Sequence, residues 1–183
     1  MCLLVFRVCV RRGSDIGGII LKYLTWELLD SAQNGDNPKV DKDWGNNCDK
    51  YYAEYSKIKK NLPKKLVQQY EADGFHDSII TTISITSDGF QRKPTRNISV
   101  ELCKMWGATV YYRGILLYQD VSIFCADMSH IKNNTAIGEY LYGEFYFDKQ
   151  ERFTHNFIFT DRNEILIKCR KIVWNEIEKN SIN

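Results

Sequence analysis

The sequence predicts an α+β fold in which two or three N-terminal helices pack on a bent antiparallel β-sheet or half-barrel of six to seven strands. Two observations lead to this prediction. Up to Gly74 the apolar residues recur at helical spacing, and beyond Gly74 they alternate with polar residues, as in strands. The 183 residues are 44% hydrophobic and 26% charged, which suits one globular domain with its own core.

Three stretches divide the chain. Residues 1–18 are expected to form a flexible leader, because a short apolar run is followed by "RRGSDIGG", a typical join. The apolar run has no basic segment before it and contains Arg7, so it does not match an export signal, and a cytoplasmic location is expected. Residues 19–74 are predicted to be helical, and residues 75–183 to form an antiparallel meander in the same domain.

Three helices are predicted before the meander. The first covers 23–35 and has Thr25 as its N-cap. The second covers 46–60, and the third covers 61–74 with Gly74 as its stop. Tyrosines and apolar residues of the second helix are expected to share its buried stripe. They are Cys48, Tyr51, Tyr52, Tyr55 and Ile58.

Seven strand-like segments follow, each with alternating apolar residues. They are 78–86, 97–105, 108–118, 120–126, 139–148, 152–160 and 164–173. The last three read as consecutive hairpins in which the order of the aromatic residues fixes the register.

A fold-back about Gln150 predicts three cross-strand pairs in that tail. Phe147 lies opposite Phe153, Phe145 opposite His155, and Leu141 opposite Phe159. The apolar members then share one dry face, to which the next strand adds its own apolar residues. The face comprises Leu141, Phe145, Phe147, Phe153, Phe157, Phe159, Ile165, Ile167 and Cys169.

The stretch "DGFHDSII" places the residue types of a hydrolytic triad side by side, as His76, Asp77 and Ser78. A triad needs its base between the nucleophile and the acid, and three consecutive residues entering a strand cannot adopt this arrangement. Asp77 is expected to share the buried phase of the strand and to fix the helix-to-strand corner, while His76 and Ser78 take the polar phase. The expected buried phase is that of Ile79, Ile83 and Ile85.

Carboxylates supply the remaining candidates for acid–base chemistry. Glu144 is predicted to lie beside Asn156 on the outer face of the sheet, and Glu101 on a strand close to Asp77. The weak catalytic candidates are therefore His76, Asp77, Glu101 and Glu144. They leave a hydrolase that uses carboxylate or histidine chemistry on the open sheet face as an alternative function.

No metal or cofactor is expected. The three histidines, at 76, 130 and 155, lack the spacing of metal ligands, and no glycine-rich phosphate loop is present. The six cysteines are far apart without a C-x-x-C pair, which predicts free thiols. His155 and Cys169 should meet among phenylalanines as inert packing rather than as a base and a nucleophile.

The charge pattern constrains the partners. A net charge of +2 argues against nucleic acid, and the lysine run "KIKKNLPKK" suits the solvated face of amphipathic helices. No apolar run reaches the roughly 20 residues of a membrane helix. The 11 Tyr and 4 Trp residues would suit a protein interface if they were exposed, while the oligomeric state stays open.

Three motifs together resemble a family of small uncharacterised bacterial proteins, chiefly from Gram-positive species. The motifs are "KYLTWELLDSAQ", "GFHDSIITTISI" and "YLYGEFYFDKQERFTHNFIFTDRNEILIKCRKI". The similarity covers roughly residues 22–173, and some proteins of similar layout are immunity proteins of toxin systems. The resemblance implies an immunity-like factor and assigns no catalytic residue.

The leading hypothesis is a non-enzymatic cytoplasmic protein that binds a protein partner. The hydrolase is one alternative, and a half-barrel that binds a small ligand through a tyrosine-lined mouth is the other.

Overall fold

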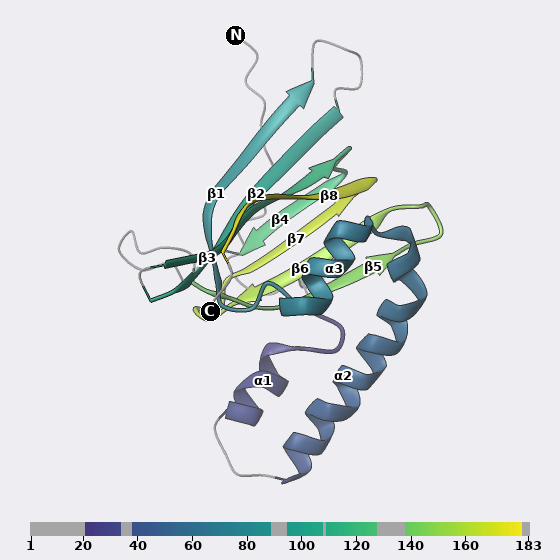
Figure 1. Cartoon of the computed structure of the whole chain (residues 1–183). Coiled ribbons are helices and arrows are strands. Elements are labelled where there is room, and N and C mark those ends of the chain that lie inside the picture. The colour runs from purple at the N-terminus through teal and green to yellow at the C-terminus, as the bar shows by residue number, and fades with distance from the viewer. Residues whose placement is uncertain (1–20, 34–37, 89–94, 108, 128–137, 181–183) are drawn as a thin grey trace.

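The computed structural model describes residues 21–33, 38–88, 95–107, 109–127 and 138–180. The predicted leader 1–18 and His130 lie outside these residues. The described part has three helices and eight strands (Figure 1).

The helices precede the strands, as predicted. They are α1 (Trp26–Gln33), α2 (Pro38–Ile58) and α3 (Lys64–Asp73), with a 3-10 turn at Lys59–Asn61. Two predicted helix ends are confirmed. Thr25 Oγ1 accepts a hydrogen bond from Leu28 N–H at 3.4 Å, and Gly74 follows α3 in the left-handed conformation at φ 62°. Helix α2 begins well before the predicted residue 46 because Pro38 suits a first helical turn.

The strands form two four-stranded antiparallel sheets. The first has the order β1-β2-β3-β8 and the second the order β4-β7-β6-β5. The strands are β1 (Ser78–Asp88), β2 (Thr95–Trp106), β3 (Thr109–Gln119), β4 (Ile123–Asp127), β5 (Tyr140–Phe147), β6 (Phe153–Phe159), β7 (Glu164–Cys169) and β8 (Lys171–Lys179).

The α+β class and the antiparallel pairing are confirmed, whereas the single sheet of six to seven strands is wrong. The predicted strand 164–173 breaks at Arg170, so that β7 pairs with β6 in one sheet and β8 pairs with β3 in the other. The buried phase changes at this break, from Ile167 and Cys169 in β7 to Ile172 and Trp174 in β8. A continuous strand cannot change phase, so the chain passes from one sheet to the other here.

The aromatic tail lies largely as predicted. Phe147 pairs with Phe153 and Phe145 with His155, but Phe159 pairs with Tyr140 rather than with Leu141. A β-bulge between Tyr140 and Tyr142 displaces Leu141 by one position. Most of the predicted dry face is buried in the space between the two sheets, where Tyr118 of β3 meets His155 of β6.

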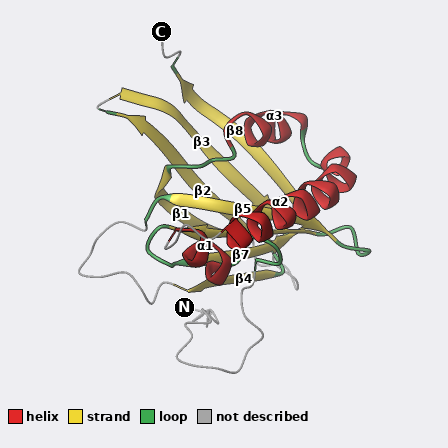
Figure 2. Ribbon diagram, turned by 90° about the horizontal axis from the view of Figure 1, so that it is seen from below, coloured by secondary structure: helices red, strands yellow, loops and turns green. Residues whose placement is uncertain are grey.

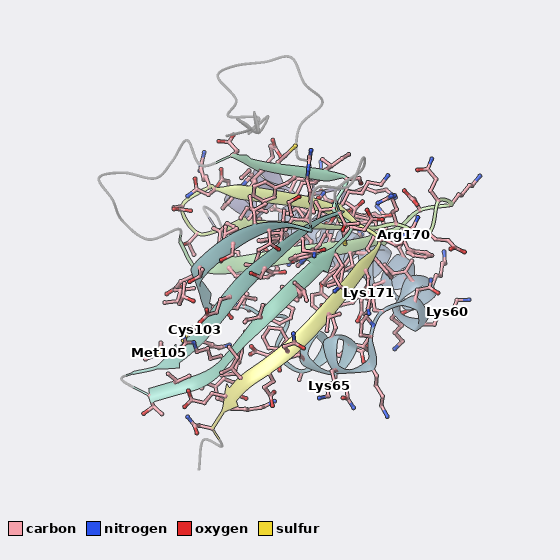
Figure 3. The ribbon with its side chains drawn as sticks, turned by 90° about the horizontal axis from the view of Figure 1, so that it is seen from above. Lys60, Lys65, Cys103, Met105, Arg170 and Lys171 are labelled. Atoms are coloured by element: carbon pink, nitrogen blue, oxygen red, sulfur yellow. The ribbon has the colours of Figure 1, made fainter. Side chains whose placement is uncertain are left out.

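The helices cover two sides of the sheets. Helix α2 runs along β5, and α3 packs beside β8, an arrangement visible from below in Figure 2. Helix α1 packs against α2, and the guanidinium of Arg162, in the turn between β6 and β7, contacts both Asp30 and the Trp26 ring. The predicted solvated lysine face is confirmed, since Lys60 and Lys65 are exposed and lie at the margin of the molecule (Figure 3).

Candidate functional site

The corner between α3 and β1 has an unusual backbone. Gly74, Phe75 and Asp77 all have positive φ, at 62°, 63° and 61°, a conformation that side-chain-bearing residues adopt at a cost. Hydrogen bonds hold it, among them Asp77 N–H to the Tyr140 carbonyl at 2.9 Å. The Phe75 ring is fully buried against Trp174, with ring centroids 5.1 Å apart. The corner is therefore a fixed platform for His76 and Asp77.

The three triad residue types of this corner do not form a triad. His76 Nδ1 lies 2.7 Å from Asp77 Oδ1, but Ser78 is fully buried and its hydroxyl is hydrogen-bonded to the hydroxyl of Tyr112. No substrate can reach this serine. The imidazole–carboxylate pair lies at the surface, with side chains 42% and 53% exposed.

The predicted phases of Asp77 and Ser78 are wrong. Ser78 faces the core, and Asp77 faces outward with a side chain 53% exposed. The physical reason is a β-bulge at Thr81, which shifts the phase by one residue. Before it Ile80 faces inward. After it Ile83, which pairs with the buried Val100 of β2, is partly buried, whereas Ile85 is 39% exposed, contrary to the prediction.

A largely buried ion pair joins this corner to the first sheet. Lys104 Nζ on β2 lies 2.7 Å from Asp73 Oδ1 at the end of α3 and 3.8 Å from Asp77 Oδ2. Since both members of the closer pair are mostly shielded from water, removing one would leave an uncompensated charge. The pair therefore ties the end of α3 to β2.

A surface pocket of about 450 Å³ opens next to the corner, where α2, α3 and β5 meet. We call it the tyrosine pocket, because four tyrosines line it. Its lining residues are Leu24, Tyr51, Tyr52, Tyr70, Glu71, Ala72, Asp73, Gly74, His76, Lys104, Leu141, Tyr142 and Gly143.

The floor of the tyrosine pocket is a chain of hydrogen bonds along the free edge of β5. The Gly143 carbonyl can only accept, so Tyr70 donates to it at 2.7 Å. Tyr51 then donates to the Tyr70 oxygen at 2.9 Å and accepts from Phe145 N–H at 3.0 Å. Burial raises the pKa of Tyr51 and of Tyr70, which keeps both phenols neutral. The two hydroxyls thus satisfy backbone groups that an edge strand leaves open.

The outer wall of the tyrosine pocket is more accessible. Tyr52 is 58% exposed, the largest exposed fraction among the described large hydrophobic residues. The Tyr142 ring meets the rings of Trp44 and His76 edge-on, with centroids 5.1 Å and 5.5 Å away. Burial raises the pKa of Tyr142, and the nearby Asp77 carboxylate adds to this effect. The Tyr142 ring of this wall is therefore a neutral phenol.

Glu144 lies elsewhere and has another role. It pairs with Asn156 as predicted, but it is fully buried rather than on an open face. Its carboxylate accepts hydrogen bonds from the backbone N–H groups of Lys22, Tyr23 and Leu24 at 2.8, 3.0 and 2.7 Å, and another from the Tyr146 hydroxyl. Burial raises the pKa of Glu144, while the backbone donors oppose the rise. Glu144 fastens the segment before α1 to the second sheet.

Glu101 and His155 are also separate from the pocket. Glu101 on β2 forms an ion pair with Arg113 of β3. His155 is fully buried between the hydroxyls of Tyr118 and Tyr140, at 2.7 Å from Nδ1 and 3.2 Å from Nε2. Burial lowers the pKa of His155 to about 3 and raises that of Cys169 to about 12, so the imidazole is neutral and the thiol protonated.

Two further observations concern the part of the chain that the structure describes. It contains no group of three or more His, Cys, Asp or Glu side chains arranged to hold a metal ion. None of its helices combines the length and the apolar character needed to cross a membrane. Comparisons with protein-family models, with curated proteins and with solved structures found no match to this chain.

Sequence reasoning missed the tyrosine pocket. It placed both Tyr51 and Tyr52 on the buried stripe of a helix, whereas Tyr51 is buried and Tyr52 is exposed. Neighbouring residues in a helix point about 100° apart, so one of the two had to leave the stripe. That spacing was the available signal. Nothing in the sequence linked these tyrosines to His76, Lys104 and Gly143.

Proposed function

We propose that this chain is a non-enzymatic binding protein that acts in the cytoplasm on a protein partner, as an immunity-like factor. The observation that supports the proposal best is the tyrosine pocket, an open hollow with a fixed floor and an exposed aromatic wall. Tyrosine is enriched among the residues that contribute most to protein interfaces.

The rigidity of the site favours recognition. The Tyr51 and Tyr70 hydroxyls are already bound to β5, and the corner at Phe75 is fixed by a buried ring. A partner that enters such a site orders few additional side chains, so less conformational entropy is lost on binding. Tyr52 is the accessible anchor.

The separation of the acidic candidates supports binding over hydrolysis. Acid–base catalysis needs its groups within hydrogen-bonding reach of one substrate. Glu144 accepts hydrogen bonds from backbone N–H groups of the segment before α1, and Glu101 is paired with Arg113 on the first sheet. Only His76 and Asp77 meet, and Ser78 beside them is buried.

The space between the sheets leaves little room for a small ligand. The side chains of Tyr118, Tyr140, His155 and Phe157 fill it, with the Tyr140 and Phe157 rings stacked at a centroid distance of 5.6 Å. A ligand would have to use the surface pocket instead, which is where we place the partner.

The test begins with capture of the partner from cells that express this chain naturally, followed by its purification. Isothermal titration calorimetry then compares the wild type with Tyr52→Ala and with the control Ile123→Ala. Ile123 is also an exposed apolar residue, 44% exposed, but it lies on β4. We expect a 1:1 complex that Tyr52→Ala weakens at least about tenfold and that Ile123→Ala leaves unchanged. Equal affinity of all three proteins, or no partner at all, would contradict the proposal.

A further inference from the structure

The charges around the tyrosine pocket do not balance. Glu71 and Asp73 line it and Asp77 stands beside it, so three carboxylates face two ammonium groups, those of Lys104 and Lys59. The carboxylates outnumber the ammonium groups by one. A site with this balance attracts a cation.

The ammonium group of Lys104 does not offer the pocket a free positive charge. It lies 2.7 Å from Asp73 Oδ1 and 3.8 Å from Asp77 Oδ2, so two carboxylates surround it. Lys59 Nζ is likewise paired with Glu71 Oε1, 3.0 Å away. An anionic ligand would have to break one of these pairs, whereas a cation would not.

Asp77 has an acceptor to spare. Its Oδ1 is bound to His76 Nδ1 at 2.7 Å, but its Oδ2 is 3.8 Å from Lys104 Nζ, too far for a hydrogen bond. The side chain is 53% exposed, so a donor from outside can reach Oδ2.

The aromatic wall favours the same kind of ligand. The faces of Tyr rings carry negative potential and attract cations. Burial raises the pKa of Tyr142, so its ring remains a neutral phenol, and Tyr52 stands at the entrance. Of the protein cations, guanidinium is planar, weakly hydrated and able to stack on a ring while it bonds to a carboxylate.

We propose that the tyrosine pocket receives an arginine side chain of the partner protein, with its guanidinium against the Tyr52 and Tyr142 rings and hydrogen-bonded to Asp77. This inference rests on the proposed function, since it names what the partner inserts. The volume of about 450 Å³ leaves room for the aliphatic part of the side chain as well.

The test uses small probes on the intact chain. Nα-acetyl-arginine amide and its neutral isostere Nα-acetyl-citrulline amide are titrated separately, and backbone amide NMR signals are followed. We expect saturable shifts near Tyr52, Asp77 and Gly143 with the arginine probe, and at least about tenfold weaker binding of the citrulline probe. Equal binding of the two probes would overturn the inference. Tighter binding of Nα-acetyl-lysine amide or of inorganic phosphate than of the arginine probe would overturn it as well.

Variants locate the site. Asp77→Asn should lower the affinity for the arginine probe about tenfold, and Tyr52→Leu should lower it about fivefold. Glu151→Gln is the matched control and should have no effect, because exposed Glu151 lies in the turn at the far end of β5. Unchanged binding by Asp77→Asn would refute the assigned contact.

The inference and the proposed function can fail separately. Equal binding of the two probes, together with a partner whose binding depends on Tyr52, would remove only the arginine assignment. Selective binding of the arginine probe, with no protein partner recovered, would remove the proposed function and keep a cation site.

Discussion

Replacing Gly143 with alanine would drive a methyl group into the side chain of Tyr140. A Cβ atom at this position would lie 1.8 Å from the Tyr140 hydroxyl oxygen and 2.9 Å from both Tyr140 Cζ and His155 Nε2. Tyr140 cannot move aside, because it is fully buried and stacked on Phe157. The strand or the ring must therefore shift.

The magnitude follows from two contributions. Overpacking of a core costs about 1–3 kcal/mol. Displacing the Tyr140 hydroxyl also removes its hydrogen bond to His155, and a buried polar group left unpaired costs about 1–3 kcal/mol more. We expect Gly143→Ala to lower the free energy of unfolding by about 2–6 kcal/mol, which corresponds to a fall in Tm of about 4–24 °C in a chain of this size.

Urea denaturation followed by tryptophan fluorescence measures this free energy directly. The control is Gly45→Ala in α2, where a Cβ atom would have nothing within 4 Å and should stabilise the helix by about 0.5–1 kcal/mol. In the Tyr140→Phe background, which lacks the clashing oxygen, the loss from Gly143→Ala should shrink by at least about 1 kcal/mol. A Gly143→Ala protein as stable as the wild type would refute the packing described for β5.

Three further predictions concern groups that the structure holds in place. Glu144→Ala removes the acceptor of the Tyr23 and Leu24 N–H groups and the closer of two acceptors of Lys22 N–H, so urea denaturation should show a loss of about 2–4 kcal/mol. An unchanged midpoint would contradict the role given to Glu144. Tyr70→Phe removes the donor to the Gly143 carbonyl and should lower the free energy of unfolding by about 1–2 kcal/mol in the same assay. Tyr52→Phe, at an exposed position, should change it by no more than about 0.5 kcal/mol. Equal losses in the two variants would argue against the hydrogen-bonded floor. The His155 imidazole, with a pKa of about 3, should show no titration by NMR between pH 8 and pH 5. The unfolded chain binds this proton near pH 6.5 and the folded chain does not, so the stability that His155 contributes is present above pH 6.5. It should fall by up to about 1.4 kcal/mol per pH unit as the pH drops from 6.5 towards 3. A His155 resonance that titrates near pH 6.5 would show that its site is open to water.

The strong alternation of the aromatic tail was sufficient to predict its register. Phe145 pairs with His155 and Phe147 with Phe153 because a one-residue slip would expose the whole row. The predictions failed at three places where the chain changes phase: the bulge at Thr81, the bulge beside Leu141 and the crossing at Arg170. One inserted residue leaves no trace in composition, so alternation alone could not reveal these places.

The candidate site was harder to predict. Its residues come from α2, α3, the corner at His76, β2 and β5, and only the folded chain brings them together. The sequence singled out His76 and Asp77, which do meet, but it did not indicate that Lys104 lies near Asp77. Which side chain of another strand lies next to a given residue depends on sheet topology, which local patterns do not specify.

The central claim is that this chain binds a protein partner through the tyrosine pocket. Hydrogen–deuterium exchange of the chain, measured alone and in the purified complex, tests it most directly. The account predicts slower exchange around Tyr52, around His76 and around Tyr142 and Gly143, with little change at β4 and at the end of β8. Protection confined to β4 or β8, with the pocket segments exchanging as fast as in the free chain, would contradict it.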